Sequence, residues 1–294
     1  MDNVYTIKEA VQKYVDKCED KVQASVVKLF VKSVLAGMMI AMGAAGSSVA
    51  AHTISDVGLA RMAAAVVFPV GLMMVILLGA ELFTGDCLMT MGTAAGRHHI
   101  GELLRVLFTV YIGNFVGAAL LAMAVYASGQ FDYSKGILGA YTIKIALGKV
   151  NLSFGRAFIS GVLCNILVCA AVLMAACAKD ITGKLLASFF GIMLFVMAGF
   201  EHCVANMYYI TAGMIAKMNP DYLMQAMNEY GYTMEQLSTL NIQNFLTANL
   251  LPVTIGNIAG GILIGLSLFY LNDKKTDKEE DKKKDKKEEF ILCK

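Results

Sequence analysis

Six long apolar stretches constrain the fold of this 294-residue chain more than any other feature. A helix needs roughly 20 predominantly apolar residues to cross the hydrocarbon core of a bilayer. The stretches cover 31–51, 62–84 (continuing to 95), 103–128, 157–178, 185–204 (continuing to 215) and 245–271. Because a segment in lipid must satisfy its own backbone hydrogen bonds, such stretches read as helices. The sequence therefore predicts an all-α polytopic membrane protein with six transmembrane helices.

Charge is concentrated at the C-terminal end of the chain. Apolar residues make up 57% of the sequence and charged residues 16%, whereas 273–289 reads DKKTDKEEDKKKDKKEE. A net charge of +2 gives no support to a nucleic-acid partner. The seven cysteines form no CxxC pair, and most lie inside apolar stretches, so they indicate neither a disulfide framework nor a metal site.

These patterns predict three parts of the chain. Residues 1–27 carry apolar side chains at helical spacing and are expected to form a cytoplasmic amphipathic helix. Residues 28–272 contain the six spans and form the transmembrane domain. The charged residues 273–294 are expected to be a disordered cytoplasmic tail.

The distribution of basic residues predicts the orientation in the membrane. Short loops rich in Lys and Arg stay in the cytoplasm. One set of connections carries Lys8, Lys13, Lys17, Lys21, Lys28, Lys32, Arg97, Arg105, Lys179, Lys184 and the tail lysines. The opposite set carries Arg61, Lys135, Lys144, Lys149, Arg156 and Lys217. We expect a multi-pass protein of the cell (inner or plasma) membrane with both termini in the cytoplasm, in agreement with an even number of spans.

Two short motifs recur in the two halves of the chain. The pattern G-x-E occurs at 79–81 in the second span and at 199–201 in the fifth, each time before a polar interruption. The pattern G-N-x-x-G occurs at 113–117 in the third span and at 256–260 in the sixth. Each half has three spans, and because three is an odd number the two halves enter the membrane in opposite directions. The sequence therefore predicts an inverted 3+3 repeat with two broken helices.

Polar residues within the apolar stretches are costly and so informative, and four stand out at the two interruptions: Glu81, Thr84, Glu201 and His202. The glutamates either accept hydrogen bonds from backbone N–H groups freed at the breaks or act in transport. His202 is either a satisfied core residue or a donor to an anion or a proton carrier. Thr84 either caps the broken helix or offers its hydroxyl to an anion at a helix N-terminus.

The longer motifs resemble one family. They are GAELFTG at 79–85, CNILVC at 164–169, GFEHCVANMY at 199–208 and NLLPVTIGN at 249–257. In these motifs, and over about residues 5–270, the chain resembles the formate/nitrite transporter family. The resemblance implies an aquaporin-like fold and a homopentamer in the lipid bilayer with one pore per protomer. It also implies a small monovalent anion as substrate: formate, nitrite or hydrosulfide.

The resemblance also assigns roles by position. Thr84 matches the threonine of the loop that breaks the second helix, and His202 matches the central pore histidine. Lys149 matches a lysine that attracts anions near the periplasmic side, and Asn165 a pore asparagine near that lysine. The expected helix-break support is Glu81, Glu201 and Asn206. The expected outer constriction is Phe68 and Phe195, and the inner one Leu72, Leu82, Phe83 and Val168.

The resemblance leaves the mechanism open. The substrate crosses either as an anion through a gated channel or as a neutral acid after protonation by His202. The chain also departs from the family pattern after Thr84. It has Gly85-Asp86 there, where some formate channels look to have Ser in place of the glycine. The alternative function is a water or small neutral solute channel of aquaporin-like fold, but paired Asn-Pro-Ala motifs are absent from the sequence. An enzyme is not expected, because no nucleophile–base pair or metal cluster appears at workable spacing. No cofactor is expected either.

Overall fold

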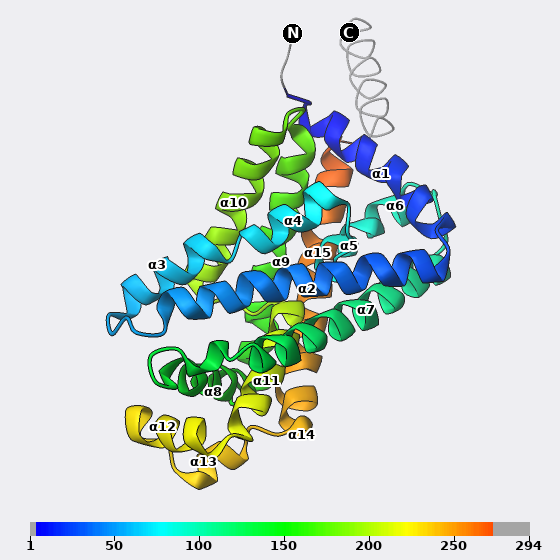
Figure 1. The fold of residues 1–294 in the computed structure, drawn as a ribbon. Coiled ribbons are helices and arrows are strands. Elements are labelled where there is room, and N and C mark those ends of the chain that lie inside the picture. Colours follow the sequence, from blue (N-terminus) through cyan, green and yellow to red (C-terminus); the bar gives the residue numbers. More distant parts are fainter. Residues whose placement is uncertain (1–3, 273–294) are drawn as a thin grey trace, which may run out of the picture.

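The computed structural model describes residues 4–272, and these residues form helices joined by short connections (Figure 1). Within this range, six helical segments are long and apolar enough to cross a membrane, as predicted. They are α2 (Val26–Ala51), α3 with α4 (Val57–Leu78), α7 (Ile100–Ala127), α9 (Phe154–Cys177), α10 (Ile181–Ala198) and the final segment Ile242–Asn272. The predicted tail, 273–294, lies outside the described residues.

The first helix, α1 (Ile7–Gln23), crosses one end of the bundle (Figure 1). Thr6 and Glu9 close its N-terminus in a reciprocal capping box. Its apolar face is buried, and the backbone N–H of Tyr5 donates to the carbonyl of Cys177 at the end of α9, 2.7 Å away. Ser25 then caps α2. Within the segment 1–27 predicted to be amphipathic, Ile7–Gln23 thus form a helix held against the bundle.

The second span is kinked and then broken. Pro69 has no backbone N–H and separates α3 (Val57–Val67) from α4 (Val70–Leu78). After α4, Gly79 adopts a left-handed conformation with φ 67°, and the chain runs without helix to α5 (Phe83–Asp86). The continuation is the 3-10 turn η1 (Cys87–Met89) and α6 (Thr90–Ala94).

The fifth span is broken in the same way. Gly199 ends α10 with φ 73°, and α11 (Cys203–Lys217) begins four residues later. A left-handed backbone is costly for residues with a Cβ, so glycine at both positions explains how each helix can stop abruptly. The predicted pair of broken helices is confirmed.

Glycines bring the helices of each half close together. A Cβ on Gly117 of α7 would lie 2.0 Å from the carbonyl oxygen of Val34 on α2. A Cβ on Gly260 of α15 (Leu251–Asn272) would lie 2.3 Å from the carbonyl oxygen of Val162 on α9. Close packing of small residues is the usual way in which helices associate in lipid. The predicted internal repeat therefore appears again in the helix packing.

Several short helices were not predicted as separate elements. They are η2 (Gln130–Asp132), α8 (Ile137–Val150), α12 (Pro220–Tyr230), α13 (Met234–Ser238) and α14 (Ile242–Asn244). In Figure 1, α8, α12 and α13 lie at the end of the molecule opposite α1. A π-helical turn, η3 (Phe245–Leu250), precedes α15. Pro252 sits in the first turn of α15 and lacks the N–H of a regular helix, which explains the irregular turn before it.

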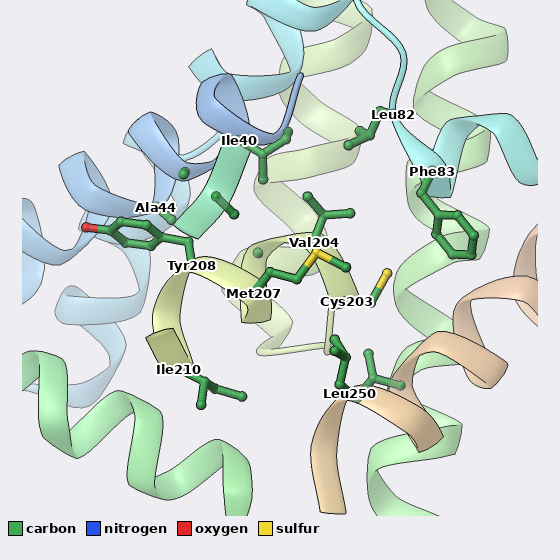
Figure 2. Close-up of a cluster of buried hydrophobic side chains, with 14 of the residues drawn as sticks. Ile40, Ala44, Leu82, Phe83, Cys203, Val204, Met207, Tyr208, Ile210 and Leu250 are labelled. Atoms are coloured by element: carbon green, nitrogen blue, oxygen red, sulfur yellow. The ribbon is translucent and has the colours of Figure 1, made fainter. Parts of the chain in front are cut away.

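The core is packed around the first turns of α11. Figure 2 shows Val204 and Met207 of α11 among side chains from α2, from the break at Leu82 and from η3. Val204 and Met207 are fully buried. Side chains of both halves thus fix the position of the second break relative to the first.

Candidate functional site

Thr84 and His202 meet in the interior of the protein. The hydroxyl oxygen of Thr84 lies 2.9 Å from Nε2 of His202, and the two residues are 0% and 3% exposed. Thr84 comes from the break of the second span and His202 from the break of the fifth. The structure therefore brings together the two polar side chains that the sequence placed at the interruptions.

The bonds of His202 define its tautomer. Its Nδ1 accepts the backbone N–H of Ala205 at 3.1 Å, which caps α11. A ring nitrogen that accepts carries no proton, so in the neutral ring the proton is on Nε2. The Nε2–H then donates to Thr84. A second proton can bind only at Nδ1, and it would end the bond to Ala205.

Two asparagines, one in each half, bond to the first residue of the helix that follows each break. Asn114 Oδ1 accepts from the N–H of Phe83 at 2.9 Å, and its Nδ2 donates to the carbonyls of Ser33 and Glu81. Asn257 Oδ1 accepts from the N–H of Cys203 at 2.9 Å. Its Nδ2 donates to the carbonyls of Gly161 and Glu201, at 2.8 and 3.0 Å. The asparagines belong to the two G-N-x-x-G motifs, so the repeat predicted from sequence includes this contact.

The glutamate side chains do not perform the capping considered for them. The freed N–H groups of Phe83 and Cys203 are bonded to asparagines, while Glu81 and Glu201 form salt bridges with lysines. An asparagine can accept and donate at once, so one side chain ties the helix start and the neighbouring helix together. A carboxylate can only accept, which explains why it is not the residue at this position.

The side chain of Asn165 is bonded at the Thr84 break. It was expected near Lys149, but its Nδ2 donates to the carbonyl of Thr84 at 3.2 Å and to that of Asn257 at 2.6 Å. The asparagine that contacts Lys149 is Asn249, whose Nδ2 donates to the Lys149 carbonyl at 3.0 Å. Helix α9 passes beside the Thr84 break, and this packing places Asn165 there.

Two aromatic rings close one side of the Thr84–His202 contact. The rings of Phe68 and Phe195 meet edge to face, with centroids 5.6 Å apart. Phe195 also stacks on the His202 ring at 5.8 Å. Both phenylalanines border a cavity of about 540 Å³ at the α8 end, the α8-side cavity. Their role as an outer constriction stays a prediction.

A second cavity lies at the α1 end and holds about 720 Å³, the α1-side cavity. Leu72 and Leu82 border it, and their role as an inner constriction stays a prediction. Phe83 and Val168 border neither cavity. The ring of Phe83 instead packs edge to face against Tyr111, with centroids 4.8 Å apart, and Val168 is buried in the core.

Positive charges line the α8-side cavity. Its charged lining residues are Arg61, Lys144, Lys149 and Glu201. Lys149 is neutralised by Glu201, with Nζ 2.9 Å from Oε1. Arg61 and Lys144 form no salt bridge within residues 4–272. The net positive charge of this cavity therefore comes from two residues that the sequence motifs did not identify.

Glu201 is the centre of a buried network. Its Oε2 accepts from Asn206 Nδ2 at 2.6 Å and from Asn249 Nδ2 at 3.3 Å. Asn249 also accepts from Asn206 at 2.8 Å. Asn249 belongs to the π-helical turn η3, and Asn206 to the first turn of α11. The expected supporting role of Glu201 and Asn206 is thus compatible with their contacts, and Asn249 joins them.

Lys21 of α1 makes the corresponding contacts in the α1-side cavity. Its Nζ lies 2.7 Å from Glu81 Oε2 and also donates to Asp86. Burial lowers the pKa of Lys21, but the charges of Asp86 and Glu81 outweigh burial and raise this pKa well above its usual value. Lys32 reaches the other oxygen of Glu81 at 3.5 Å. Neither Lys21 nor Asp86 was singled out as a site residue, although both occur beside recognised features of the sequence.

Comparison with known proteins gives one family. The family profile described as "Formate/nitrite transporter" matches residues 8–271. The protein named "Formate channel FocA" from Haemophilus influenzae is 38% identical over 217 residues, which is 73% of this chain and 75% of that protein. The "Probable formate transporter" of Methanothermobacter thermautotrophicus is 36% identical over 270 residues, covering 86% of this chain and 91% of that protein.

Solved structures give the same result. A chain titled "Pentameric formate channel with formate bound" aligns with a TM-score of 0.75 at 31% identity, covering 84% of this chain and 96% of that chain. An "FNT family ion channel" aligns with a TM-score of 0.74 at 26% identity, covering 90% of this chain and 99% of that one.

Proposed function

The chain belongs to the formate/nitrite transporter family, and on this premise we propose that it passes small monovalent anions across a membrane, with formate as the first candidate. The observation that carries the proposal is the buried contact between Thr84 and His202. It joins two broken helices, and cavities border the constrictions on its two sides. Broken helices at the midplane are typical of substrate sites in transport proteins built from inverted repeats.

The α8-side cavity attracts the anion. Arg61 and Lys144 supply its uncompensated charge, and a cavity of one sign raises the local concentration of counter-ions. Lys149 lies deeper and shares its charge with Glu201. Its part in the pathway is to offer ammonium protons to the anion at the rim of the constriction, while Arg61 and Lys144 act at longer range.

The constrictions favour a neutral species. A charge at the centre of a bilayer costs on the order of 2.5–3.5 kcal/mol on insertion scales. The rings of Phe68 and Phe195 and the side chains of Leu72 and Leu82 offer no compensating polar group. Passage as the conjugate acid avoids this cost, since formic acid has no charge to desolvate.

His202 is the proposed proton donor. In its neutral state Nε2–H is a hydrogen-bond donor only, because a neutral imidazole gives up that proton very reluctantly. To act as an acid, the ring must first take a second proton at Nδ1, which releases the N–H of Ala205. Proton transfer is thereby coupled to the cap of α11, and Thr84 receives the Nε2–H when no substrate is present.

Assembly and location are part of the same proposal. We infer a homopentamer, since one aligned structure is titled a pentameric formate channel. The location is the cell membrane with both termini in the cytoplasm, as the basic residues at the α1 end favour. The helix α1 is then cytoplasmic, and the six spans form the channel in the lipid bilayer.

The experiment is flux into proteoliposomes that contain the purified protein. Formate, nitrite, hydrosulfide and acetate are offered separately at equal concentration, and empty liposomes are the control. The proposal expects saturable flux of at least one of these anions, above the leak of empty liposomes. Flux equal to that of empty liposomes for all four would refute it.

A further inference from the structure

The two cavities contain equivalent groups of three residues. The α8-side triad is Lys149, Glu201 and Asn206, and the α1-side triad is Lys21, Glu81 and Asp86. In each half the third member follows the glutamate by five positions. In each half, too, the lysine precedes by four positions the serine at the N-cap of the next helix, Ser25 or Ser153. The internal repeat therefore relates the triads residue by residue.

The geometry of the two lysines is also equivalent. Lys21 lies 2.7 Å from Glu81 and Lys149 lies 2.9 Å from Glu201. Their side chains are 20% and 16% exposed. Each ammonium faces a tyrosine ring, at 5.8 Å for Lys21 and 5.4 Å for Lys149. Each lysine borders the cavity of its own side.

The triads differ at their third member. In the α8-side triad, Asn206 is neutral and donates to Glu201 at 2.6 Å, so the three side chains sum to zero charge. In the α1-side triad, Asp86 accepts from Lys21 beside Glu81, so two carboxyl groups contact the Lys21 ammonium where Lys149 contacts one. Asp86 is 2% exposed, and its Oδ2 has no hydrogen-bond partner within residues 4–272.

We propose that Asp86 sets the affinity of the α1-side mouth for the permeating anion, by holding Lys21 as an internal counter-ion. An anion that reaches this mouth competes with Glu81 and Asp86 for Lys21, whereas Lys32 reaches Glu81 only. At the other mouth it competes with Glu201 alone. The two mouths of the pore thus differ in affinity although their backbones are related by the repeat. This inference rests on the proposed function.

The alternative is that Asp86 only fixes α1 in place. Other contacts already do this: Arg105 donates to the carbonyl of Val22, Arg97 binds Asp16 and Glu19, and the Tyr14 hydroxyl donates to the carbonyl of Gly85 at 2.9 Å. Loss of the Lys21–Asp86 bond therefore leaves α1 with contacts at its middle and its end. If Asp86 only anchors α1, the two substitutions below shift the half-saturating formate concentration in the same direction. If Asp86 is a counter-ion of Lys21, they shift it in opposite directions.

The test compares Asp86→Asn with Lys21→Gln. Formate flux is measured in vesicles of each orientation, and a protease-sensitive tag at the N-terminus identifies the face that carries α1. Asp86→Asn gives the α1-side triad the composition of the other one, so the half-saturating formate concentration from the α1 face falls by ~3-fold or more. Lys21→Gln raises it by a similar factor. Values measured from the opposite face define the reference for each variant.

Controls separate the charge effect from misfolding. Lys28→Gln removes an exposed lysine on the same side that does not border the cavity, and should leave the half-saturating concentration unchanged. Maleimide labelling of Cys18, a buried thiol of α1, reports whether α1 has detached. Asp86→Ser replaces Asp86→Asn if that variant does not fold.

Two results would overturn the inference. One is that Asp86→Asn and Lys21→Gln shift the half-saturating concentration in the same direction, as loss of an anchor would. The other is that Asp86→Asn leaves the value unchanged from the α1 face. If the unsubstituted protein carries no formate from either face, the proposed function fails and this inference fails with it.

Discussion

The two ring nitrogens of His202 have different partners, and this difference decides what the side chain can do. Nδ1 accepts the N–H of Ala205, while Nε2 is bonded to Thr84 and the ring stacks on Phe195. A residue that only filled the core would not need both bonds. The arrangement instead leaves one N–H that can turn from the threonine hydroxyl to a substrate oxygen.

His202→Asn should abolish the pH dependence of formate flux, because the amide cannot be protonated between pH 5 and 8 but can still cap α11. Flux is measured in proteoliposomes over that pH interval. Thr84→Val and Thr84→Ser test the partner: serine keeps the hydroxyl and should retain flux, and valine should lower it. An unchanged pH profile in His202→Asn would rule out the relay.

Asn257→Ala should destabilise the protein by about 2–4 kcal/mol, because it leaves the Cys203 N–H and the Glu201 carbonyl without partners in the interior and removes a second hydrogen bond from the Gly161 carbonyl. The measurement is thermal unfolding of the detergent-solubilised protein. Asn228→Ala, at an exposed site, is the control and should have no measurable effect. Equal unfolding temperatures for the two variants would show that Asn257 does not support the break.

Some of these residues were predictable and others were not. Thr84 and His202 stand out because polar residues are costly inside apolar stretches. Asn114 and Asn257 appear in the repeated motif, but nothing in the sequence shows that an amide, and not the nearby carboxylate, meets the freed N–H. The contacts of Asn165 with Thr84 and Asn257 could not be predicted, because they join different spans and depend on helix packing.

At the scale of elements, each half is a pair of tightly packed helices that hold a broken one. Gly117 and Gly260 let α7 approach α2 and α15 approach α9 until backbone contacts backbone. The asparagine three positions before each glycine then reaches across to the break. Close packing and the position of the break are therefore linked through the same motif.

Gly117→Ala should prevent correct assembly of the first half, because a methyl group 2.0 Å from the Val34 carbonyl cannot be accommodated without separating the helices. Gly101→Ala on the same helix is the matched control, since no atom lies within 4 Å of its Cβ. It should change stability by no more than about 1 kcal/mol. Size-exclusion profiles and unfolding temperatures compare the two, and similar behaviour would contradict the packing argument.

The elements differ in how readily the sequence shows them. Long apolar spans and glycine-terminated breaks have strong local causes and were predicted. The short helices α8 and α12 were missed because neither is long enough to span a bilayer and each gains its stability by packing against other helices. The π-helical turn η3 was missed too, although Pro252 marks its end.

At the scale of the whole molecule, the two halves provide two cavities with different electrostatics. In the α8-side cavity Arg61 and Lys144 form no salt bridge within residues 4–272, whereas the α1-side cavity has lysines interspersed with carboxylates. The sequence predicted the two halves from repeated motifs. It could not predict the cavities, because they are lined by residues from distant parts of the chain, including α1 and α8.

The assembled protein should have the mass of five chains of 31.6 kDa each. Native mass spectrometry after removal of detergent measures this directly, and crosslinking in membranes is the control for dissociation during purification. A dominant species of one or two chains by both methods would contradict the pentamer.

The central claim is that a pathway for small anions passes between the two breaks. Formate and water permeability, measured in the same proteoliposomes by stopped-flow, test it most directly. We expect fast, saturable formate flux and water permeability no higher than that of empty liposomes. Fast water flow without formate flux would contradict it and would favour the water-channel alternative.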